Sequence, residues 1–230
     1  MSLFAIADLH LSLGTNKPMD IFKGWDNYVE RMEKNWRAVV GEEDTVVIAG
    51  DISWAMRIED SAADFAMIHS LPGKKLILKG NHDYWWTTRK KMEEFFEENG
   101  FTSIGIIHNS AERVGEYAVC GTRGWFYDAE LSGEDQTVLL REVGRLNLSL
   151  DAAEKTGLEP VVFLHYPPLY AQSVCGEMME VLRTRGVKRC YYGHIHGGRA
   201  AEKAVTGLVD GIEFSLIACD SLNFTPIRVG

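Results

Sequence analysis

The sequence predicts an α/β fold, because short apolar runs typical of buried strands alternate with segments that have the apolar period of a helix. The runs at 45–51 (TVVIAGD) and 160–165 (PVVFLH) are almost continuously apolar, as in strands that are covered on both faces. Between such runs, apolar residues recur at spacings of three and four. With 230 residues, 46% hydrophobic and 25% charged, the chain has the composition of a globular protein with a sizeable core.

In the first half of the chain, each expected strand leads into an expected helix. Strands are expected at 3–8, 45–51 and 74–80, and helices at 59–70 and 87–99. A further helix after the first strand is indicated by apolar residues that would share one buried face, namely Val29, Met32, Trp36 and Val39. Thr87 or Thr88 would cap the helix at 87–99, and Gly100 stands just past its end.

The second half continues the same alternation. Strands are expected at 102–108, 117–124, 160–165 and 187–196, and helices at 134–156 and 176–185. The tail at 211–229 has β character and no long helical pattern. Because the chain has no internal repeat, low-complexity tract or Pro/Gly/Ser-rich linker, we expect one domain over residues 1–230.

Charge and cysteine usage exclude several classes of protein. The net charge of −9 argues against binding to extended nucleic acid or anionic lipid, since surfaces that track phosphates are basic. The cysteines, at 120, 175, 190 and 219, have no zinc-ribbon spacing and fit a reducing compartment. The N-terminus lacks a signal-peptide pattern, and no apolar segment is long enough to span a membrane. We therefore expect a cytoplasmic protein.

Polar side chains with metal-binding chemistry stand at the ends of the expected strands. These are Asp8, Asp51, Asn81 followed by His82, His165, and the pair His194 and His196 in YYGHIHGG (191–198). In open α/β sheets, ligands bind outside the carboxyl ends of the strands. If these side chains had only structural roles, each buried one would need its own hydrogen-bond or ion-pair partner. The histidine pair would then simply face solvent at the end of its strand.

The residue types in this set favour a transition metal. Imidazole mixed with carboxylate or carbonyl oxygen suits Zn, Mn or Fe better than Ca or Mg. A single metal with an open position for water needs three to five protein ligands, and the set is larger than that. The surplus indicates two metals with a carboxylate between them, an arrangement that recurs in displacement reactions at phosphorus.

The motifs resemble those of the calcineurin-like metallophosphoesterases. DLH (8–10), GD (50–51), GNHD (80–83), the lone His165 and GHIH (193–196) occur in the order of that family. The resemblance implies a four-layer αββα sandwich, in which two mixed β-sheets are flanked by helices. Because only strand-like sequence follows His196, we expect no large capping domain.

The resemblance also implies a role for each residue. Asp8, His10 and His196 would bind one metal, Asn81, His165 and His194 would bind the other, and Asp51 would bridge the two. A hydroxide held between the metals would attack phosphorus, because coordination lowers the pKa of water towards about 7. His82 would protonate the leaving group, and Asp83 would orient His82.

One motif departs from the family's protein Ser/Thr phosphatases. Those enzymes have GDxxDRG, where this chain has GDISWAM (50–56), with Trp54 and Ala55 in place of the aspartate and arginine. The departure argues against protein phosphatase activity. Arg123, in GTRGW, could grip the substrate phosphate instead, although an ordinary salt bridge is an equal alternative.

Other histidines and the aromatic residues have competing interpretations. His69, within a helical pattern, is expected to be structural, and His108, at the end of the strand-like GIIH, matches no family motif. Aromatic residues gather beside the motifs, at Trp54, Tyr84, Trp85, Trp86, Trp125, Phe126 and Tyr166. They would either pack in the core or stack on a flat, nucleotide-like leaving group.

The sequence thus predicts a metal-dependent phosphoric ester hydrolase that acts on a phosphomonoester or phosphodiester of a small molecule. Manganese is expected to restore its activity best after chelation. The alternatives are a non-catalytic scaffold on the same fold and a nuclease of the same superfamily. A complete ligand set with His82 counts against the first, and the acidic balance counts against the second. The sequence does not determine the oligomeric state.

Overall fold

The computed structural model describes residues 1–126 and 133–229 and contains two large β-sheets that face each other. The first sheet has the strand order β13-β1-β2-β3-β4, and the second has the order β11-β12-β10-β7-β6-β5. Their strands are β1 (Leu3–Ile6), β2 (Thr45–Ala49), β3 (Lys74–Leu78), β4 (Ile104–Ile106), β5 (Ala111–Val114), β6 (Tyr117–Thr122), β7 (Glu159–Leu164), β10 (Arg189–Tyr192), β11 (Gly207–Val209), β12 (Ile212–Leu216) and β13 (Ile227–Arg228). A separate small hairpin pairs β8 (Leu169–Tyr170) with β9 (Ser173–Val174).

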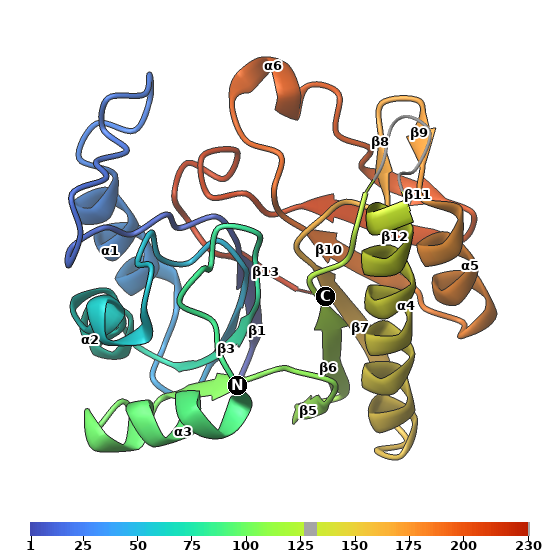
Figure 1. The fold of residues 1–230 in the computed structure, drawn as a ribbon, viewed down its shortest axis with the longest axis horizontal. Coiled ribbons are helices and arrows are strands. Elements are labelled where there is room, and N and C mark those ends of the chain that lie inside the picture. Colours follow the sequence, from blue (N-terminus) through green and yellow to red (C-terminus); the bar gives the residue numbers. More distant parts are fainter. Residues whose placement is uncertain (127–132, 230) are drawn as a thin grey trace.

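Helices cover the outer face of each sheet, which confirms the predicted four-layer αββα sandwich (Figure 1). Those on the first sheet are α1 (Tyr28–Val39), α2 (Ala62–Ser70), which follows the 3₁₀ turn η1 (Ile58–Ser61), and α3 (Arg89–Glu98). Those on the second sheet are α4 (Gly133–Glu154) and α5 (Gly176–Thr184). A short helix, α6 (Gly198–Ala201), follows the histidine pair. Within the described residues, no helix is long and apolar enough to cross a membrane.

The alternation of side chains along each strand explains the layers. In β1, Phe4 and Ile6 pack against the helices, whereas Leu3 and Ala5 pack between the two sheets. Strand β7 divides its side chains in the same way between the second helical layer and the space between the sheets. Because both faces of each sheet are buried, the central strands are mostly apolar.

The parallel pairing of the central strands gathers their carboxyl ends. Strands β1, β2, β3 and β4 are parallel, as are β6, β7, β10 and β12. Strands β13, β11 and β5 pair antiparallel at the sheet edges. Polar residues that follow β1, β2 and β3 in one sheet therefore face those that follow β7 and β10 in the other.

Two local predictions were wrong. Val39 was expected on the buried face of α1, but it is 41% exposed, and Tyr28 takes part in the core instead. His108 was expected to end a strand, but β4 ends at Ile106. The cysteines are all buried and free, as expected of small apolar residues.

Candidate metal centre

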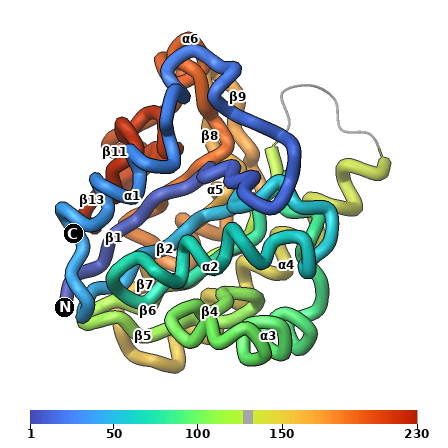
Figure 2. The backbone as a smooth tube through the Cα atoms, turned by 90° about the vertical axis from the view of Figure 1, so that its left-hand side faces the viewer, coloured from blue at the N-terminus to red at the C-terminus, as the bar shows by residue number. Residues whose placement is uncertain are grey.

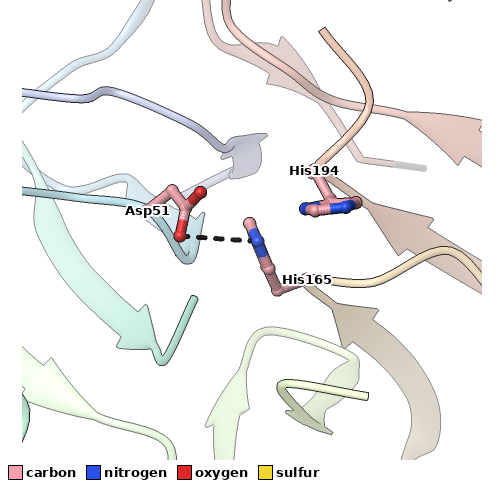
Figure 3. A group of neighbouring side chains, drawn as sticks. All are labelled: Asp51, His165 and His194. Atoms are coloured by element: carbon pink, nitrogen blue, oxygen red, sulfur yellow. Dashed lines mark ion pairs between the residues drawn. The ribbon is translucent and has the colours of Figure 1, made fainter. Parts of the chain in front are cut away.

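The facing carboxyl ends bring the predicted ligands of both sheets together. Asp8 and His10 follow β1, Asp51 follows β2, Asn81 follows β3, His165 follows β7, and His194 and His196 follow β10. Two groups have ligand atoms within 4.8 Å of one another, namely Asp8, His10 and Asp51, and Asp51, His165 and His194. Figure 3 shows the second group, with Asp51 from the first sheet facing the two histidines of the other. The two groups share Asp51, the residue predicted to bridge.

In the second group, an unprotonated nitrogen of His165 faces carboxylate and amide oxygens. His165 Nδ1 lies 3.1 Å from the carbonyl oxygen of Ala49, so this nitrogen carries the proton. His165 Nε2 then presents a lone pair, and it faces Asn81 Oδ1 at 2.6 Å and Asp51 Oδ1 at 3.4 Å. Asn81 Oδ1 also lies 2.9 Å from His194 Nδ1. A cation between these atoms would satisfy all of them, so the residues fit a metal.

The first group contains buried polar atoms without partners. His10 Nε2 and Asp51 Oδ2 lie 3.7 Å apart, and neither makes a hydrogen bond. Buried polar atoms are almost always paired, so an unpaired acceptor and carboxylate oxygen side by side indicate a missing positive partner. The ring centroid of His196, another predicted ligand, lies 5.1 Å from that of His10. These residues also fit a metal.

Burial sets the protonation states that metal binding needs. Burial lowers the pKa of His165 and His194 to about 3, so both imidazoles are neutral and able to coordinate. Burial raises the pKa of Asp51 to about 6, and burial together with the Asp51 charge raises that of Asp8 well above its usual value. Such acids favour a nearby cation, which would stabilise their ionised forms.

Several predicted ligands have a strained backbone. Asp8, His10, Asp51 and His194 have φ of 60°, 46°, 50° and 70°, in the left-handed region that non-glycine residues rarely adopt. Strain of this kind collects at functional sites, where the surrounding structure enforces it. No feature of the sequence marked these conformations.

The glycine beside the histidine pair is required by close approach. A Cβ on Gly193 would lie 2.6 Å from Asp8 Oδ2, so a larger residue would displace a ligand. The backbone N–H of His194 donates to both oxygens of Asp8, at 3.0 and 2.9 Å. The glycine therefore lets the loop after β10 reach the loop after β1 and orient its carboxylate.

Asp83 connects the ligand loops. Its carboxylate accepts hydrogen bonds from the backbone N–H of Asp51 (2.9 Å), Ile52 (2.8 Å) and Gly80 (2.6 Å), and from Trp85 Nε1 (3.0 Å). Burial and the neighbouring Asp51 raise the pKa of Asp83 to about 7, and the donated hydrogen bonds oppose that rise. Asp83 thus joins the loops after β2 and β3.

His82 is held by a different set of contacts from the one expected. Its backbone N–H donates to Asp51 Oδ1 at 2.8 Å, and its Nδ1 has no hydrogen-bond partner. Its ring centroid is 4.6 Å from that of Trp54, which also stacks on His10 at 4.8 Å. Trp54, in the GDISWAM segment, lies beside the two histidine rings.

Arg123 lies next to the site and is already paired. Its guanidinium is 3.3 Å from Glu142, a fully buried carboxylate on α4 that also accepts from Thr122 and Arg145. The Arg123 carbonyl oxygen accepts from the backbone N–H of His165 at 3.1 Å. The salt-bridge alternative is thus present, and Glu142 is a residue that sequence reasoning missed.

The remaining predicted residues divide between core and site. His69 contacts Ser103 Oγ at 2.8 Å, as expected of a structural histidine, and His108 belongs to neither ligand group. Trp85 is buried in the core, whereas the Tyr166 ring centroid is 4.3 Å from that of His194. Trp25, which no pattern indicated, contacts the rings of His10 and His196.

Similar proteins share this fold. A crystal structure of a protein of unknown function from Aquifex aeolicus superposes with a TM-score of 0.54 at 15% identity, covering 99% of this chain and 95% of that one. The phosphopantetheinyl hydrolase of Mycobacterium tuberculosis superposes with a TM-score of 0.56 at 13% identity, with the same coverage of 99% and 95%. At these identities the likeness shows the fold alone.

Sequence similarity identifies the family. The Gene 66 protein of Mycobacterium phage L5 is 37% identical over 86 residues, which make up 34% of this chain and 37% of that protein. The match therefore spans little more than a third of the curated relative. The family model of the calcineurin-like phosphoesterases matches residues 1–198, which include every predicted ligand. The chain belongs to the calcineurin-like phosphoesterase family.

Proposed function

We propose that this chain is a dinuclear metal-dependent phosphoesterase that hydrolyses a phosphomonoester or phosphodiester of a small, nucleotide-like molecule. The observation that carries the proposal is the shared Asp51. It belongs to two separate groups of close ligand atoms, and its buried Oδ2 has no partner in the protein. A carboxylate placed between two ligand groups suits a pair of ions.

The ligand sets follow the two groups. Asp8, His10 and His196 would hold one ion, and Asn81, His165 and His194 would hold the other, with Asp51 common to both. When bound, such ions supply positive charge for the phosphoryl oxygens and lower the pKa of water to near 7. Manganese, iron and zinc all suit this mixed nitrogen and oxygen set.

The other residues act on the substrate and on the ligand loops. His82 is the general acid in this proposal, because its backbone is fixed to Asp51 and its ring centroid lies 5.8 Å from that of His10. Asp83 acts as a positioning residue, through the backbone it binds on both sides of the site. Arg123 would contact the substrate phosphate while Glu142 holds its guanidinium.

We propose that residues 1–230 act as one domain in the cytoplasm.

The completeness of the ligand set supports an enzyme over a non-catalytic scaffold, since a site that serves only as a platform has no need of strained, unpaired ligands.

Metal analysis with an ester panel tests the proposal. The protein is purified without chelators, its metal content is measured, and p-nitrophenyl phosphate, bis-p-nitrophenyl phosphate and alkyl esters are assayed with EDTA and then with Mn, Fe or Zn. We expect about two ions per chain, loss of activity in EDTA, and restoration, best with Mn. One ion or none, or two ions without hydrolysis of any ester, would contradict it.

A further inference from the structure

A cavity of about 530 Å³ opens beside the candidate metal centre. Three of its lining residues belong to the site, namely His10, His82 and His196. The rest come from the segment between β1 and α1, from Trp54, and from the start of α6. Figure 2 shows that segment and α6 at the same end of the molecule, at the top of the view. The volume lies in the range of small-molecule sites.

The position of the cavity assigns it to one side of the reaction. It contains His82, the proposed acid, but none of Asn81, His165 and His194 lines it. A leaving group that receives its proton from His82 must lie on the His82 side of the phosphorus atom. The cavity on that side is therefore placed to hold the leaving group, not the phosphoryl group.

The lining selects for an aromatic group. Apart from the histidines, its side chains are Met19, Phe22, Trp25, Trp54 and one charged residue, Lys23. Phe22 is 52% exposed, so a ring face is open to a ligand. Among the described residues, the lining contains no carboxylate and no amide or hydroxyl side chain, so a sugar would find few hydrogen-bond partners there and a cationic group would find no negative partner. Flat rings, in contrast, stack well on aromatic side chains.

We propose that this cavity is a leaving-group subsite that accepts an aromatic group, in which Phe22 stacks on the ring and His82 meets the ester oxygen. The assignment rests on the proposed phosphoesterase function, which it deepens by naming the class of leaving group. The aromatic residues that the sequence drew attention to contribute only Trp54 to the lining; Phe22 and Trp25 are contributed by the segment before α1.

Binding and kinetics with matched ligands test the subsite. Binding of 2-naphthylmethylphosphonate and methylphosphonate, which cannot be hydrolysed, is measured by calorimetry on the Mn-treated protein. KM is measured for 2-naphthyl phosphate and glycerol phosphate. The variants are Phe22→Ala and Ile21→Ala, the latter a neighbour that is 75% exposed and does not line the cavity.

We expect the naphthyl ligand to bind about 10-fold tighter than the methyl ligand, in line with the worth of one ring stacking on an aromatic side chain. Phe22→Ala should remove this preference and raise KM for the naphthyl ester about 10-fold, with KM for glycerol phosphate unchanged. Ile21→Ala should change neither. Equal affinities for the two phosphonates, or equal effects of Phe22→Ala on both esters, would overturn the subsite.

The binding arm separates this inference from the proposed function. If no ester is hydrolysed but the naphthyl preference is present and is lost in Phe22→Ala, the subsite stands and the enzymatic function fails. If both esters are hydrolysed with equal KM and Phe22→Ala affects neither, the function stands and the subsite is overturned.

Discussion

Two aspartates lie at opposite ends of strand β2 and differ in the burial and hydrogen bonding of their carboxylates. Asp44, before the strand, accepts backbone hydrogen bonds from Ser2 at 2.6 Å and Gly41 at 2.9 Å, which lower its pKa. Asp51, after the strand, is buried beside Asp8 and His10, and burial raises its pKa to about 6. One carboxylate is satisfied by the protein, and the other is left with an unpartnered oxygen.

The pKa shifts of Asp44 and Asp51 have opposite signs, and they have opposite effects on stability. The lowered pKa of Asp44 contributes stability that is present above its unfolded pKa and is lost as the pH falls through the folded value. The raised pKa of Asp51 means that its ionised form opposes folding, and this penalty grows as the pH rises from about 3.9 towards 6. The amino end of the sheet thus stabilises the fold, whereas the carboxyl end keeps charge available for a ligand.

Exchanging each aspartate for asparagine is the strongest test of this contrast. Asp51→Asn should lose both ions and more than about 10⁴-fold in activity for every ester. The loss should exceed the contribution of a single positioned acid, about 10²–10⁴-fold, because both metal sites are disturbed. The same variant should melt at a higher temperature than the wild type in EDTA at pH 7.5, because a buried charge is gone. Asp44→Asn should show the reverse, with full activity and a lower melting temperature. Assays and thermal melts of both variants decide it; parallel changes in the two would contradict the contrast.

The next test compares His82, at the carboxyl end of the first sheet, with His69, near its amino end. His82→Ala should keep both metals but lose about 10²–10⁴-fold in kcat on an alkyl ester, the usual contribution of a positioned acid. The loss should shrink on p-nitrophenyl phosphate, whose leaving group departs without needing a proton. His69→Ala, at the amino end beside Ser103, should leave both rates unchanged.

Equal losses on the two esters in His82→Ala would show support of the site without proton transfer. Loss of metal from that variant would show that His82 is a ligand.

Metal removal should show the same contrast through stability. Mn²⁺ at about 100-fold above its dissociation constant should add about 2.7 kcal/mol for each ion bound, a melting shift of about 5–10 °C per ion for a chain of this size. At pH 5 the shift should be smaller, because Asp51, with a pKa of about 6, is then largely protonated, while His165 and His194, with pKa values of about 3, stay neutral. Melts with Mn²⁺ or EDTA at pH 5.0 and 7.5 measure this. An equal shift at both pH values would contradict it.

The sequence was informative about the fold because periodicity reports burial directly. From the apolar run alone, β2 could be predicted as a buried strand, with Asp51 at its carboxyl end. Val39 could not, because its spacing fits a buried stripe, yet the core face of this segment runs through Met32, Trp36 and Val40 and leaves Val39 exposed. Helix orientation is set by contacts between distant segments, which a local period does not contain.

The positions of the candidate ligands at strand ends were predictable, but the residues that support them were not. Asp8 and His194 could be found because metal-binding residue types at strand ends are unusual. Asp83 was expected to orient His82, yet its carboxylate binds the backbone around Asp51 and Gly80. A side chain that binds backbone has no fixed partner type, so no pattern in the sequence reveals it. The same holds for Glu142, whose partners lie about 20 residues away, at Thr122 and Arg123.

Lys75 limits how far the contrast between the two ends extends. It lies at the amino end of β3, is buried, and has its pKa lowered by burial to about 8. Its ammonium nevertheless donates to the carbonyl oxygens of His69 and Leu71, at the end of α2, and to Ser103 Oγ. A perturbed pKa alone therefore does not mark the functional end; the two groups of facing ligand atoms do.

Replacing Lys75 should change stability and its dependence on pH, and leave activity unchanged. Between about pH 8 and 10.5 the unfolded chain holds a proton that folded Lys75 has lost, so the wild type gains stability with rising pH over that window. Lys75→Met should remove this gain, which is at most about 1.4 kcal/mol per pH unit for one proton. Activity at pH 7.5 should be unchanged, and Lys74→Met, at a neighbour with a side chain 53% exposed, should keep the wild-type slope. Urea unfolding from pH 7.5 to 10 measures the free energy of unfolding against pH for each variant. Parallel curves for wild type and Lys75→Met would show that the buried lysine keeps its proton. A loss of activity would show that Lys75 contributes to the candidate site.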